Sequence, residues 1–426
     1  MACAQKLLYT ASPNLVPLTL LILGGGAAGF FAAITAAETD ANAQVILLEK
    51  SRQLLAKVRV SGGGRCNVTH ACFDPAVLAQ NYPRGGEALR GPFTRFGPRE
   101  TVAWFESRGV RLKTEPDGRM FPVTDDAQTI VNCLIDSARR AGVEIRTEAG
   151  IESVERSESG FEIRLRDGEV VRGDRVLIAT GGNRPGHQWA AGLGHTIVPP
   201  VPSLFTFHIR DSRLAGLAGV SAAKTELRLG KLRQVGPTLI THWGLSGPAV
   251  LKLSAWGARE LHKCGYRAEL NVNWLPDYNE AELTRTLRET KTEHPRRTIL
   301  SHTPLPLPQR LWERLAAAAG VAESRRWTEL SKSELRGLVD QLSNGKYQIA
   351  GKSLFKEEFV TCGGVSLKEV DFKTMESRIC PGLYFAGEIL DIDGLTGGFN
   401  FQSAWTTGWL AGRAMALTHT PDSLSR

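Results

Sequence analysis

Three glycines that follow an apolar run have the spacing of a phosphate-binding turn. Residues 18–23 are almost wholly apolar, and Gly24, Gly26 and Gly29 come directly after them. In such a turn the first glycine permits a tight bend, the second lets a pyrophosphate approach the backbone, and the third allows a helix to pack closely on a strand. The phosphates then lie at the helix N-terminus, where unpaired N–H groups and the helix dipole favour anions. The spacing therefore predicts a dinucleotide-binding site.

The residues around these glycines predict the βαβ unit that would hold them. Residues 27–38 are rich in alanine and predict a helix, and residues 45–49 predict a second buried strand. Glu49 ends that strand 20 residues after Gly29, where a carboxylate accepts hydrogen bonds from the adenosine ribose. A glycine-rich turn in an α/β core without a ligand is the alternative interpretation. Three neighbours complete the first part of the predicted site: Ala27, Ala28 and Lys50.

Two later glycine elements favour FAD over NAD as the cofactor. Thr180-Gly181 and Gly387-Glu388 each follow an apolar strand, and the second pair lies near the C-terminus. A long cofactor that reaches from the first turn to contacts from the end of the chain fits FAD. In that layout Glu388 binds the ribityl or phosphate hydroxyls. Residues 394–402 would then begin a helix whose N–H groups face the pyrimidine edge of the flavin, where negative charge builds up on reduction.

The rest of the chain predicts a Rossmann-like α/β domain that is interrupted by an insert. Pro199, Pro200 and Pro202 mark a change of character from about residue 198, after which short β-like segments give way to helical patterning. The final segment returns to a strand, a glycine turn and a helix. We therefore expect four parts: an N-terminal extension at 1–18, a first cofactor-binding part at 19–197, an insert at 198–355 with a helical subdomain at about 276–345, and a second cofactor-binding part at 356–426.

Composition and charge limit the classes of function. Hydrophobic residues make up 42% of the 426 residues and charged residues 23%, which excludes wholesale disorder. The net charge of +8 leaves an anionic ligand or a nucleic-acid partner open. No basic block or Arg-rich tail concentrates this charge, which argues against nucleic acid.

Cysteines and apolar runs bear on the compartment. Seven cysteines without a C-x-x-C spacing favour a reducing cytosol over a disulfide framework or a thiolate zinc site. Residues 15–37 are apolar for more than 20 positions, but Pro17 and the glycines within them predict a strand, a turn and a helix instead of a membrane span. The start of the chain lacks the apolar region of a signal peptide. We therefore expect a cytoplasmic protein with no membrane partner.

Several motifs occur together in an order that resembles a known family. The chain resembles the BaiN/YhiN-type flavoproteins, which are NAD(P)/FAD-dependent oxidoreductases of the aminoacetone-oxidase-like group, over about residues 19–416. The resemblance implies a glutathione-reductase-type FAD domain interrupted by a small β-barrel and a helical piece, with FAD bound. One branch of the family reduces carbon–carbon double bonds conjugated to a ketone in steroid-like bile acid intermediates. The motifs that carry the resemblance span residues 24–29, 61–67, 374–377, 382–388 and 391–400.

The same resemblance assigns a second set of residues to the cofactor. Glycines of the 61–67 motif would admit the planar ring, Arg65 would offer donors to phosphate or flavin oxygens, and Asn67 would offer both donor and acceptor. An Arg and an Asn that merely close a loop are the alternative. Ile151 would present its backbone to adenine, or be a plain strand residue. The residues along the flavin or its diphosphate are Lys57, Ser61, Gly62, Gly63, Arg65, Cys66 and Asn67, and those of the late motif are Asp393, Gly397, Gly398, Phe399 and Asn400.

The remaining reactive side chains do not form a recognisable catalytic set. Cys66 and Cys72 are not at the four-residue spacing of flavin-linked disulfides, and buried packing is the favoured role for Cys66 over a thiol beside the flavin. The histidines have no metal-type spacing, so we expect structural roles and no metal site. Residues 241–248 are glycine-rich and lie in the insert, where a substrate could meet the flavin. The histidines are His187, His195, His208 and His242.

These features predict an FAD-dependent oxidoreductase. NADH or NADPH would transfer a hydride to flavin N5, and the flavin would reduce a small organic acceptor, such as a conjugated enone, under the insert. Because the chain has a single dinucleotide fingerprint, the nicotinamide cofactor would bind in the shared cleft. A flavin-dependent RNA-modifying enzyme and an FAD-containing sensor without turnover are the alternatives. The sequence predicts neither the catalytic proton donor nor the oligomeric state.

Overall fold

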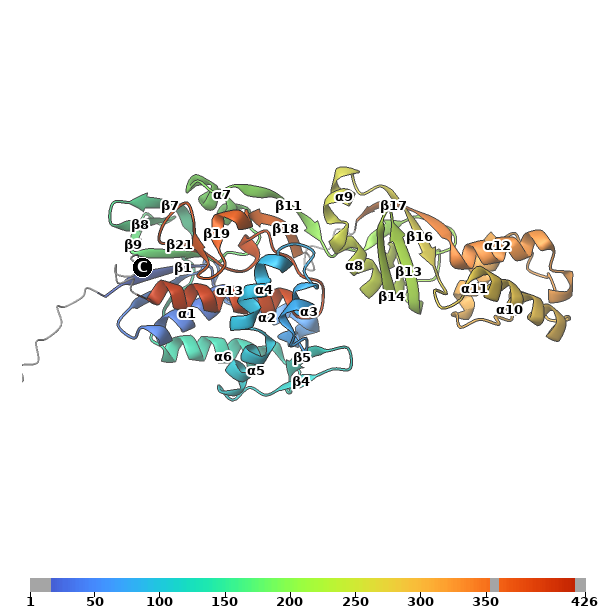
Figure 1. The fold of residues 1–426 in the computed structure, drawn as a ribbon, viewed down its shortest axis with the longest axis horizontal. Coiled ribbons are helices and arrows are strands. Elements are labelled where there is room, and N and C mark those ends of the chain that lie inside the picture. The colour runs from blue at the N-terminus through green and yellow to red at the C-terminus, as the bar shows by residue number, and fades with distance from the viewer. Residues whose placement is uncertain (1–16, 353–359, 418–426) are drawn as a thin grey trace, which may run out of the picture.

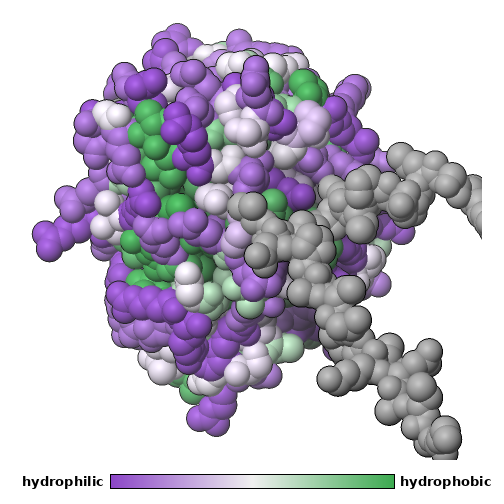
Figure 2. Space-filling view, turned by 90° about the vertical axis from the view of Figure 1, so that its left-hand side faces the viewer, coloured by the Kyte–Doolittle hydropathy of each residue, from purple (hydrophilic) through white to green (hydrophobic). Residues whose placement is uncertain are grey.

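The structure is a computed structural model that describes residues 17–352 and 360–417 (Figure 1). Residues 1–16 of the predicted N-terminal extension lie outside the described residues, as does the predicted boundary at 355/356. The described chain forms a body of helices around a central sheet and, at the other end of the long axis, a β-barrel followed by helices. Figure 2 shows the end of the molecule that is opposite the barrel, where hydrophilic residues flank a narrow band of hydrophobic ones.

The central sheet has seven strands in the order β19-β20-β21-β10-β1-β2-β6. Its middle strands are parallel and apolar, with Leu21 opposite Val176, and β1 and β10 are buried on both faces, as expected for a covered parallel sheet. The predicted βαβ unit at the first glycines is therefore confirmed. The strands are β1 (Thr19–Leu23), β2 (Gln44–Leu48), β6 (Glu144–Arg146), β10 (Arg175–Ile178) and β21 (Leu383–Phe385), with β19 (Val370–Asp371) and β20 (Glu376–Ser377) antiparallel at the edge.

Two helices from opposite ends of the sequence pack together beside the sheet. These are α1 (Ala27–Thr39) and α13 (Phe399–Ala416), which run side by side in Figure 1. Glycines allow this contact, since a Cβ added at Gly408 would lie 2.6 Å from the carbonyl oxygen of Ala28, and one at Gly412 would lie 2.2 Å from that of Ala32. The backbones of the two helices therefore touch, and the first turn of α1 lies beside the middle of α13.

Smaller elements surround this layer. In the described part of the chain, the body also contains two three-stranded sheets and six further α-helices. One sheet has the order β3 (Thr69–His70), β5 (Arg119–Pro122), β4 (Leu112–Thr114). The other has the order β7 (Ile151–Ser157), β8 (Gly160–Leu165), β9 (Val170–Gly173). The helices are α2 (Ala56–Gly64), α3 (Pro75–Ala79), α4 (Gly86–Arg95), α5 (Pro98–Glu106), α6 (Ala127–Arg140) and α7 (Arg184–Gly192). Helix α2 runs into the 61–67 motif and is broken at Ser61, Gly62 and Gly63, whose backbone angles are not helical.

The insert is a closed six-stranded barrel in the order β12-β15-β14-β13-β16-β17. Two strands, β11 (Ile197–Ser203) and β18 (Val360–Val365), pair antiparallel and link it to the body, so the boundary expected at 198 falls inside β11. Among the β-like segments after residue 198, residues 204–209 form a strand only over β12, and Leu204 has a left-handed backbone (φ 57°). The barrel strands are β12 (Phe207–Ile209), β13 (Ser221–Leu229), β14 (Leu232–Thr241), β15 (Gly244–Ser246), β16 (Ala268–Asn273) and β17 (Gly345–Lys352).

Helices cover the barrel and extend it. Helix α8 (Pro248–Trp256) packs along β14 and leads into α9 (Ala258–Lys263). Beyond β16 lie α10 (Glu280–Glu293), α11 (Gln309–Ala318) and α12 (Lys332–Ser343), where Trp312 and Trp327 stack with ring centroids 6.2 Å apart. Barrel and helices share one apolar core that is separate from the core of the central sheet. None of the described helices combines the length and the apolar character needed to cross a bilayer.

Candidate functional site

The glycine turn after β1 has the geometry that the fingerprint requires. A Cβ at Gly24 (φ 115°) would lie 2.6 Å from the carbonyl oxygen of Ala179 at the end of β10, and one at Gly29 would lie 1.9 Å from the carbonyl oxygen of Gly24. The fold itself therefore needs these two glycines. A Cβ at Gly26 would meet nothing within 4 Å. Gly26 is also the N-cap of α1, and because glycine has no side chain, it leaves the first N–H groups of the helix uncapped. Open space thus lies at the positive end of this helix.

Glu49 holds the glycine turn from the neighbouring strand. Its Oε2 accepts a hydrogen bond from the N–H of Gly25 (2.8 Å), and its Oε1 accepts from the backbone and hydroxyl of Ser51 (2.9 and 2.8 Å). A carboxylate can accept about four hydrogen bonds, so one remains for a ribose hydroxyl. Predicted Lys50 is exposed beside it. Ile151 begins β7 two residues after Ala149, whose N–H donates to the carbonyl oxygen of Glu49 (2.9 Å).

Three predicted segments from distant parts of the sequence meet at the start of α1. Lys57 and Glu388 form an ion pair, and a Cβ at Gly181 would lie 3.6 Å from Oε2 of Glu388. A Cβ at Gly387 would lie 3.0 Å from Cβ of Ala28 in the first turn of α1. The structure therefore brings the first glycine turn, Lys57, the β10 turn and the β21 turn together. A positive side chain and a helix N-terminus beside open space suit a diphosphate.

A buried hydroxyl without a partner adjoins this group. Oγ1 of Thr180 is buried and makes no hydrogen bond in the part of the chain that the structure describes. Leaving such a hydroxyl unpaired costs free energy. It faces α7, since a Cβ at Gly186 would lie 2.0 Å from it. The open space at Gly26, at the start of α1, is therefore the feature that fits the FAD predicted from the sequence.

The predicted contacts around α13 are used mostly to hold loops. With its amide oriented to satisfy its neighbours, Asn67 donates to the carbonyl oxygens of Thr69 (3.0 Å) and Met120 (3.2 Å), and accepts from the N–H of Gly398 (2.9 Å). A Cβ at Gly398, the N-cap of α13, would lie 2.5 Å from the carbonyl oxygen of Thr69. The side-chain amide of Asn400 accepts a hydrogen bond from the N–H of Gly394 and donates one to its carbonyl oxygen. Asn67 and Asn400 thus fix the start of α13, and their contact with the flavin stays a prediction.

Arg65 is also engaged with its own domain. Its Nη1 lies 2.6 Å from Glu115 and 3.4 Å from Asp125, and its guanidinium lies 4.0 Å from the centroid of the Phe121 ring. The hydrogen bond to Glu115 contributes most to raising the pKa of Arg65. A Cβ at Gly62 would lie 2.9 Å from the N atom of Asn67, whereas Gly63 has open space. These contacts hold Arg65 within its own domain, and its contact with the cofactor stays a prediction.

Asp393 forms a buried ion pair at the junction with the insert. Its carboxylate is fully buried; both oxygens accept from Arg84, and Oδ2 also accepts from the hydroxyl of Ser203 (2.8 Å). Nη1 of Arg84 donates in addition to the carbonyl oxygen of Ala255 at the end of α8 (2.7 Å). Sequence reasoning missed Arg84, since a lone arginine in a polar stretch carries no motif. The pair joins the body to the barrel.

His70 is a second residue that the sequence did not single out. Its ring stacks on predicted Phe399 (centroids 4.8 Å apart, 18° between planes), and its Nε2 lies 3.1 Å from the carbonyl oxygen of Asp117. Because a carbonyl only accepts, Nε2 is the donor, and the unprotonated Nδ1 is buried without a partner among the described residues. Burial, with the charge of Lys252 from α8, lowers the pKa of His70. A Cβ at Gly397 would lie 3.4 Å from this ring.

Of the other predicted histidines, His187 and His195 are buried, His208 is half-buried and His242 is exposed. His195 lies 3.2 Å from Glu369 through Nδ1 and 2.9 Å from the hydroxyl of Ser377 through Nε2. His187 is buried, and burial lowers its pKa. No group of three or more potential metal ligands occurs in the described residues.

Cys66 is expected to be unreactive in the native protein. It is fully buried in the main core, and burial raises its pKa to about 12, so at pH 8 about one thiol in 10⁴ is a thiolate. Iodoacetamide should label exposed Cys264 within minutes and leave Cys66 unmodified until denaturant is added, as mapped by peptide mass spectrometry. Rapid labelling of native Cys66 would instead indicate a thiol exposed beside the cofactor.

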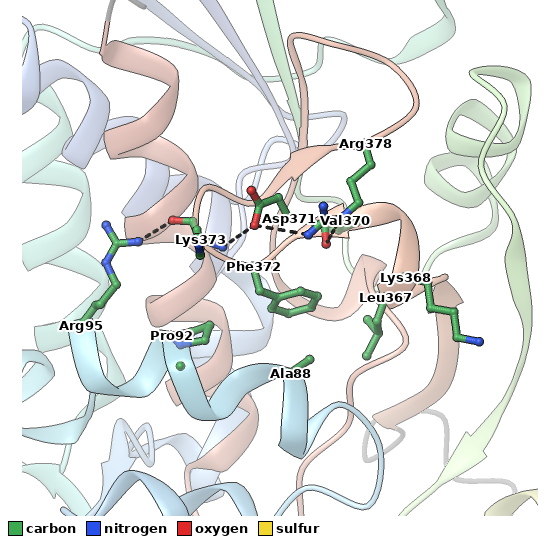
Figure 3. Close-up of a pocket in the computed structure, with 11 residues that line it drawn as sticks. Ala88, Pro92, Arg95, Leu367, Lys368, Val370, Asp371, Phe372, Lys373 and Arg378 are labelled. Carbon is green, nitrogen blue, oxygen red and sulfur yellow. Dashed lines mark hydrogen bonds and ion pairs between the residues drawn. The ribbon is translucent and has the colours of Figure 1, made fainter. Parts of the chain in front are cut away.

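A separate surface cavity lies between α4 and the edge strands β19 and β20 (Figure 3). Its volume is about 630 Å³. Phe372 points from the β19–β20 loop towards α4, and Lys368 and Arg378 lie at the rim. None of the predicted cofactor residues lines this cavity, so it is distinct from the glycine-lined site.

The parallel sheet, the glycine turn and the late glycine–carboxylate turn define a Rossmann-type FAD-binding fold. The chain belongs to the family described as HI0933-like protein Rossmann domain, whose model matches residues 18–414. This confirms the resemblance found in the sequence, and places the chain among FAD-dependent oxidoreductases.

Two curated relatives match nearly the whole chain. The sequence is 33% identical over 407 residues to the 3-dehydro-bile acid delta(4,6)-reductase of Clostridium scindens, covering 93% of this chain and 98% of the relative. It is 31% identical over 401 residues to the ribosomal RNA dihydrouridine synthase of Escherichia coli, covering 91% and 96%. The 3-ketosteroid-delta4-(5alpha)-dehydrogenase of Rhodococcus jostii RHA1 has a similar fold (TM-score 0.50, 16% identity, 95% of this chain and 98% of that one).

Proposed function

We propose that this protein is an FAD-dependent reductase that takes a hydride from NADH or NADPH and reduces a carbon–carbon double bond conjugated to a carbonyl group. The meeting of the first glycine turn, Lys57 and Glu388 around the open end of α1 is the observation that carries the proposal. The two relatives support the choice of reaction. A delta(4,6)-reductase and a dihydrouridine synthase both add two hydrogens across a bond conjugated to a carbonyl.

The chain's own residues would hold the cofactor and orient the acceptor. The open side of Gly26 and the first turn of α1 receive the diphosphate, Lys57 adds positive charge there, and Glu49 accepts from the ribose. The first turn of α13, fixed by Asn67, offers N–H groups to the flavin edge. Bound FAD would supply hydride acceptance and donation. Nδ1 of His70 lies free to accept a hydrogen bond from the ligand.

Anaerobic reduction tests this function. Protein with FAD should lose its flavin absorbance near 450 nm when NADH or NADPH is added, and one nucleotide should act at least about tenfold faster at equal concentration. A steroid with a ketone conjugated to a double bond should then restore the absorbance, and its saturated analogue should not. If neither nucleotide bleaches the flavin while dithionite does, a sensor without turnover is the better description.

A uridine base in RNA is a second candidate acceptor. The C5–C6 bond of uracil is conjugated to the C4 carbonyl, so it needs the same chemistry as an enone. The charge distribution of the barrel favours this candidate: its residues 198–275 and 345–352 hold 12 Lys and Arg but only 4 Asp and Glu. After incubation with NAD(P)H and an RNA from a strain that lacks the protein, nucleoside mass spectrometry should find a mass increase of two hydrogens in uridine.

A further inference from the structure

All of the net charge of the protein resides in the barrel. Outside residues 198–275 and 345–352 the chain has 40 Lys and Arg and 40 Asp and Glu, so the barrel accounts for the whole +8. The helical segment 276–344 is close to balance, with 11 basic and 10 acidic residues. The basic residues are scattered along the sequence and form no block. The fold gathers them, and the surface that results was not visible in the sequence.

Strand register places many of these cations at one end of the barrel. The tight turn between β13 and β14 contains Lys231, with Leu229 paired to Leu232. A Cβ at Gly257, between α8 and α9, would lie 3.2 Å from both leucine side chains. Arg228 lies opposite Asn271 in β16, so the start of β16 is at this end too. We define the α9 end of the barrel as the surface formed by Arg228, Lys231, Arg233, Lys263 and Arg267.

The α9 end has more positive charge than its neighbours neutralise. Arg228 and Arg233 share one buried carboxylate, that of Glu226. Although burial opposes ionisation, the two arginines hold the pKa of Glu226 below its ordinary value. The other three cations are exposed and form no ion pair in the described chain: Lys231, Lys263 and Arg267. Glu260 is the acidic residue of α9.

Aromatic rings lie among these cations. Trp256 is 38% exposed and directly precedes Gly257. Tyr266, next to Arg267, packs against Phe205 and His262 (centroids 5.5 and 5.9 Å apart), and Nζ of Lys352 lies 5.3 Å from its ring centroid, so Trp256 is the more exposed of the two rings. Cations that contact phosphates, interleaved with flat rings on which bases stack, are the chemistry by which proteins bind single-stranded nucleic acid.

The α9 end also adjoins the predicted flavin segment. Arg84 joins the end of α8 to Asp393, and Arg259 of α9 lies 3.3 Å from Asp391. Residues 391–400 are those assigned to the flavin edge. A polyanion held on the α9 end would therefore lie beside the loop that precedes α13.

We propose that the α9 end of the barrel binds the phosphate backbone of RNA in a single-stranded or looped region. RNA binding by this surface is argued from its charge and its aromatic rings alone. Delivery of a base to the flavin, by contrast, depends on the proposed function. The surface is separate from the residues that hold the cofactor, so binding and flavin chemistry can be tested apart.

The test uses the full chain with FAD and a fluorescein-labelled, single-stranded RNA of 20 nucleotides with mixed sequence. Anisotropy at several salt concentrations should show binding that weakens steeply with salt. The triple variant Lys231→Glu, Lys263→Glu, Arg267→Glu should weaken binding at least about tenfold. The slope of log K against log salt should fall by about 2, because each single-strand phosphate contact contributes about 0.7.

A control with the same charge change distinguishes this surface from general electrostatics. Arg314→Glu, Lys332→Glu and Arg336→Glu replace exposed cations on α11 and α12, and this variant should keep most of the affinity. Equal weakening by both variants, no salt-dependent RNA binding by the parent protein, or a preference for anionic lipid vesicles over RNA would overturn the proposal. The first variant should retain its FAD content and its bleaching by NAD(P)H. If bleaching fails in the parent while RNA binding follows the prediction, only the proposed function falls.

Discussion

Gly26→Val should give a folded protein that is colourless. A Cβ at Gly26 meets no protein atom within 4 Å, and the backbone angles (φ −93°, ψ −170°) accept any residue. The valine side chain would fill the space from which a diphosphate approaches the start of α1. We expect FAD affinity to fall at least about 100-fold, or about 2.7 kcal/mol. The absorbance near 450 nm after purification, and titration of the apoprotein with FAD, measure it.

Stability controls separate this loss from misfolding. Valine is a poorer N-cap than glycine, so apo Gly26→Val should lose no more than about 1 kcal/mol relative to the apo parent; the apo forms must be compared because bound FAD itself stabilises. Gly91→Val, at another glycine with open space, should keep full colour. Gly29→Ala should fail to fold, because its Cβ would lie 1.9 Å from a carbonyl oxygen. Full flavin content in Gly26→Val would place the diphosphate elsewhere.

Arg84→Ala should destabilise the protein by about 3–5 kcal/mol, the usual cost of leaving a buried charge without its partner. Asp393 is fully buried and both its oxygens accept from Arg84. Burial already raises the pKa of Asp393, and Arg84 opposes that effect. Without Arg84 the carboxyl should therefore bind a proton more readily. The difference in free energy of unfolding between variant and parent should be largest near pH 8 and should decrease as the pH falls towards 4, as measured by denaturant unfolding.

Two comparisons distinguish the buried pair from an ordinary ion pair. Arg172→Ala removes an exposed partner of Glu162 (side chains 71% and 37% exposed) and should cost at most about 1 kcal/mol. Arg84→Met combined with Asp393→Leu removes both charges and should recover most of the stability lost in Arg84→Ala. If Arg84→Ala costs no more than Arg172→Ala, water must reach Asp393 at the domain junction.

The βαβ unit could be predicted from the sequence because the residues that determine it lie close together in the chain. The run at 18–23, the glycine spacing and Glu49 each act within about 30 residues, and β1, α1 and β2 follow them closely. The barrel was implied by family resemblance, since its strands are short and pair across long stretches of chain. Helix α2 was missed because Gly62 and Gly63 obscure the helical turn before them.

Roles that depend on tertiary neighbours were not accessible from one sequence. Arg65 and Asn67 carry donors that suit a cofactor, yet Glu115 accepts from Arg65, and the carbonyl oxygens of Thr69 and Met120 accept from Asn67. No sequence feature near Arg84 indicates its ion pair with Asp393, which lies more than 300 residues away. The α9 end collects cations from β13, β14, α9 and the turn before β16, which only the register brings together.

The contact between α1 and α13 has a consequence for synthesis on the ribosome. Helix α1 emerges early, but the partner against which its glycine-lined face packs ends only at residue 416. During translation this face of α1 stays uncovered until α13 has been made. The barrel strands all precede α13, so the barrel can complete its own core earlier. Chaperone occupancy of the nascent chain between the synthesis of α1 and that of α13 follows from this order of assembly.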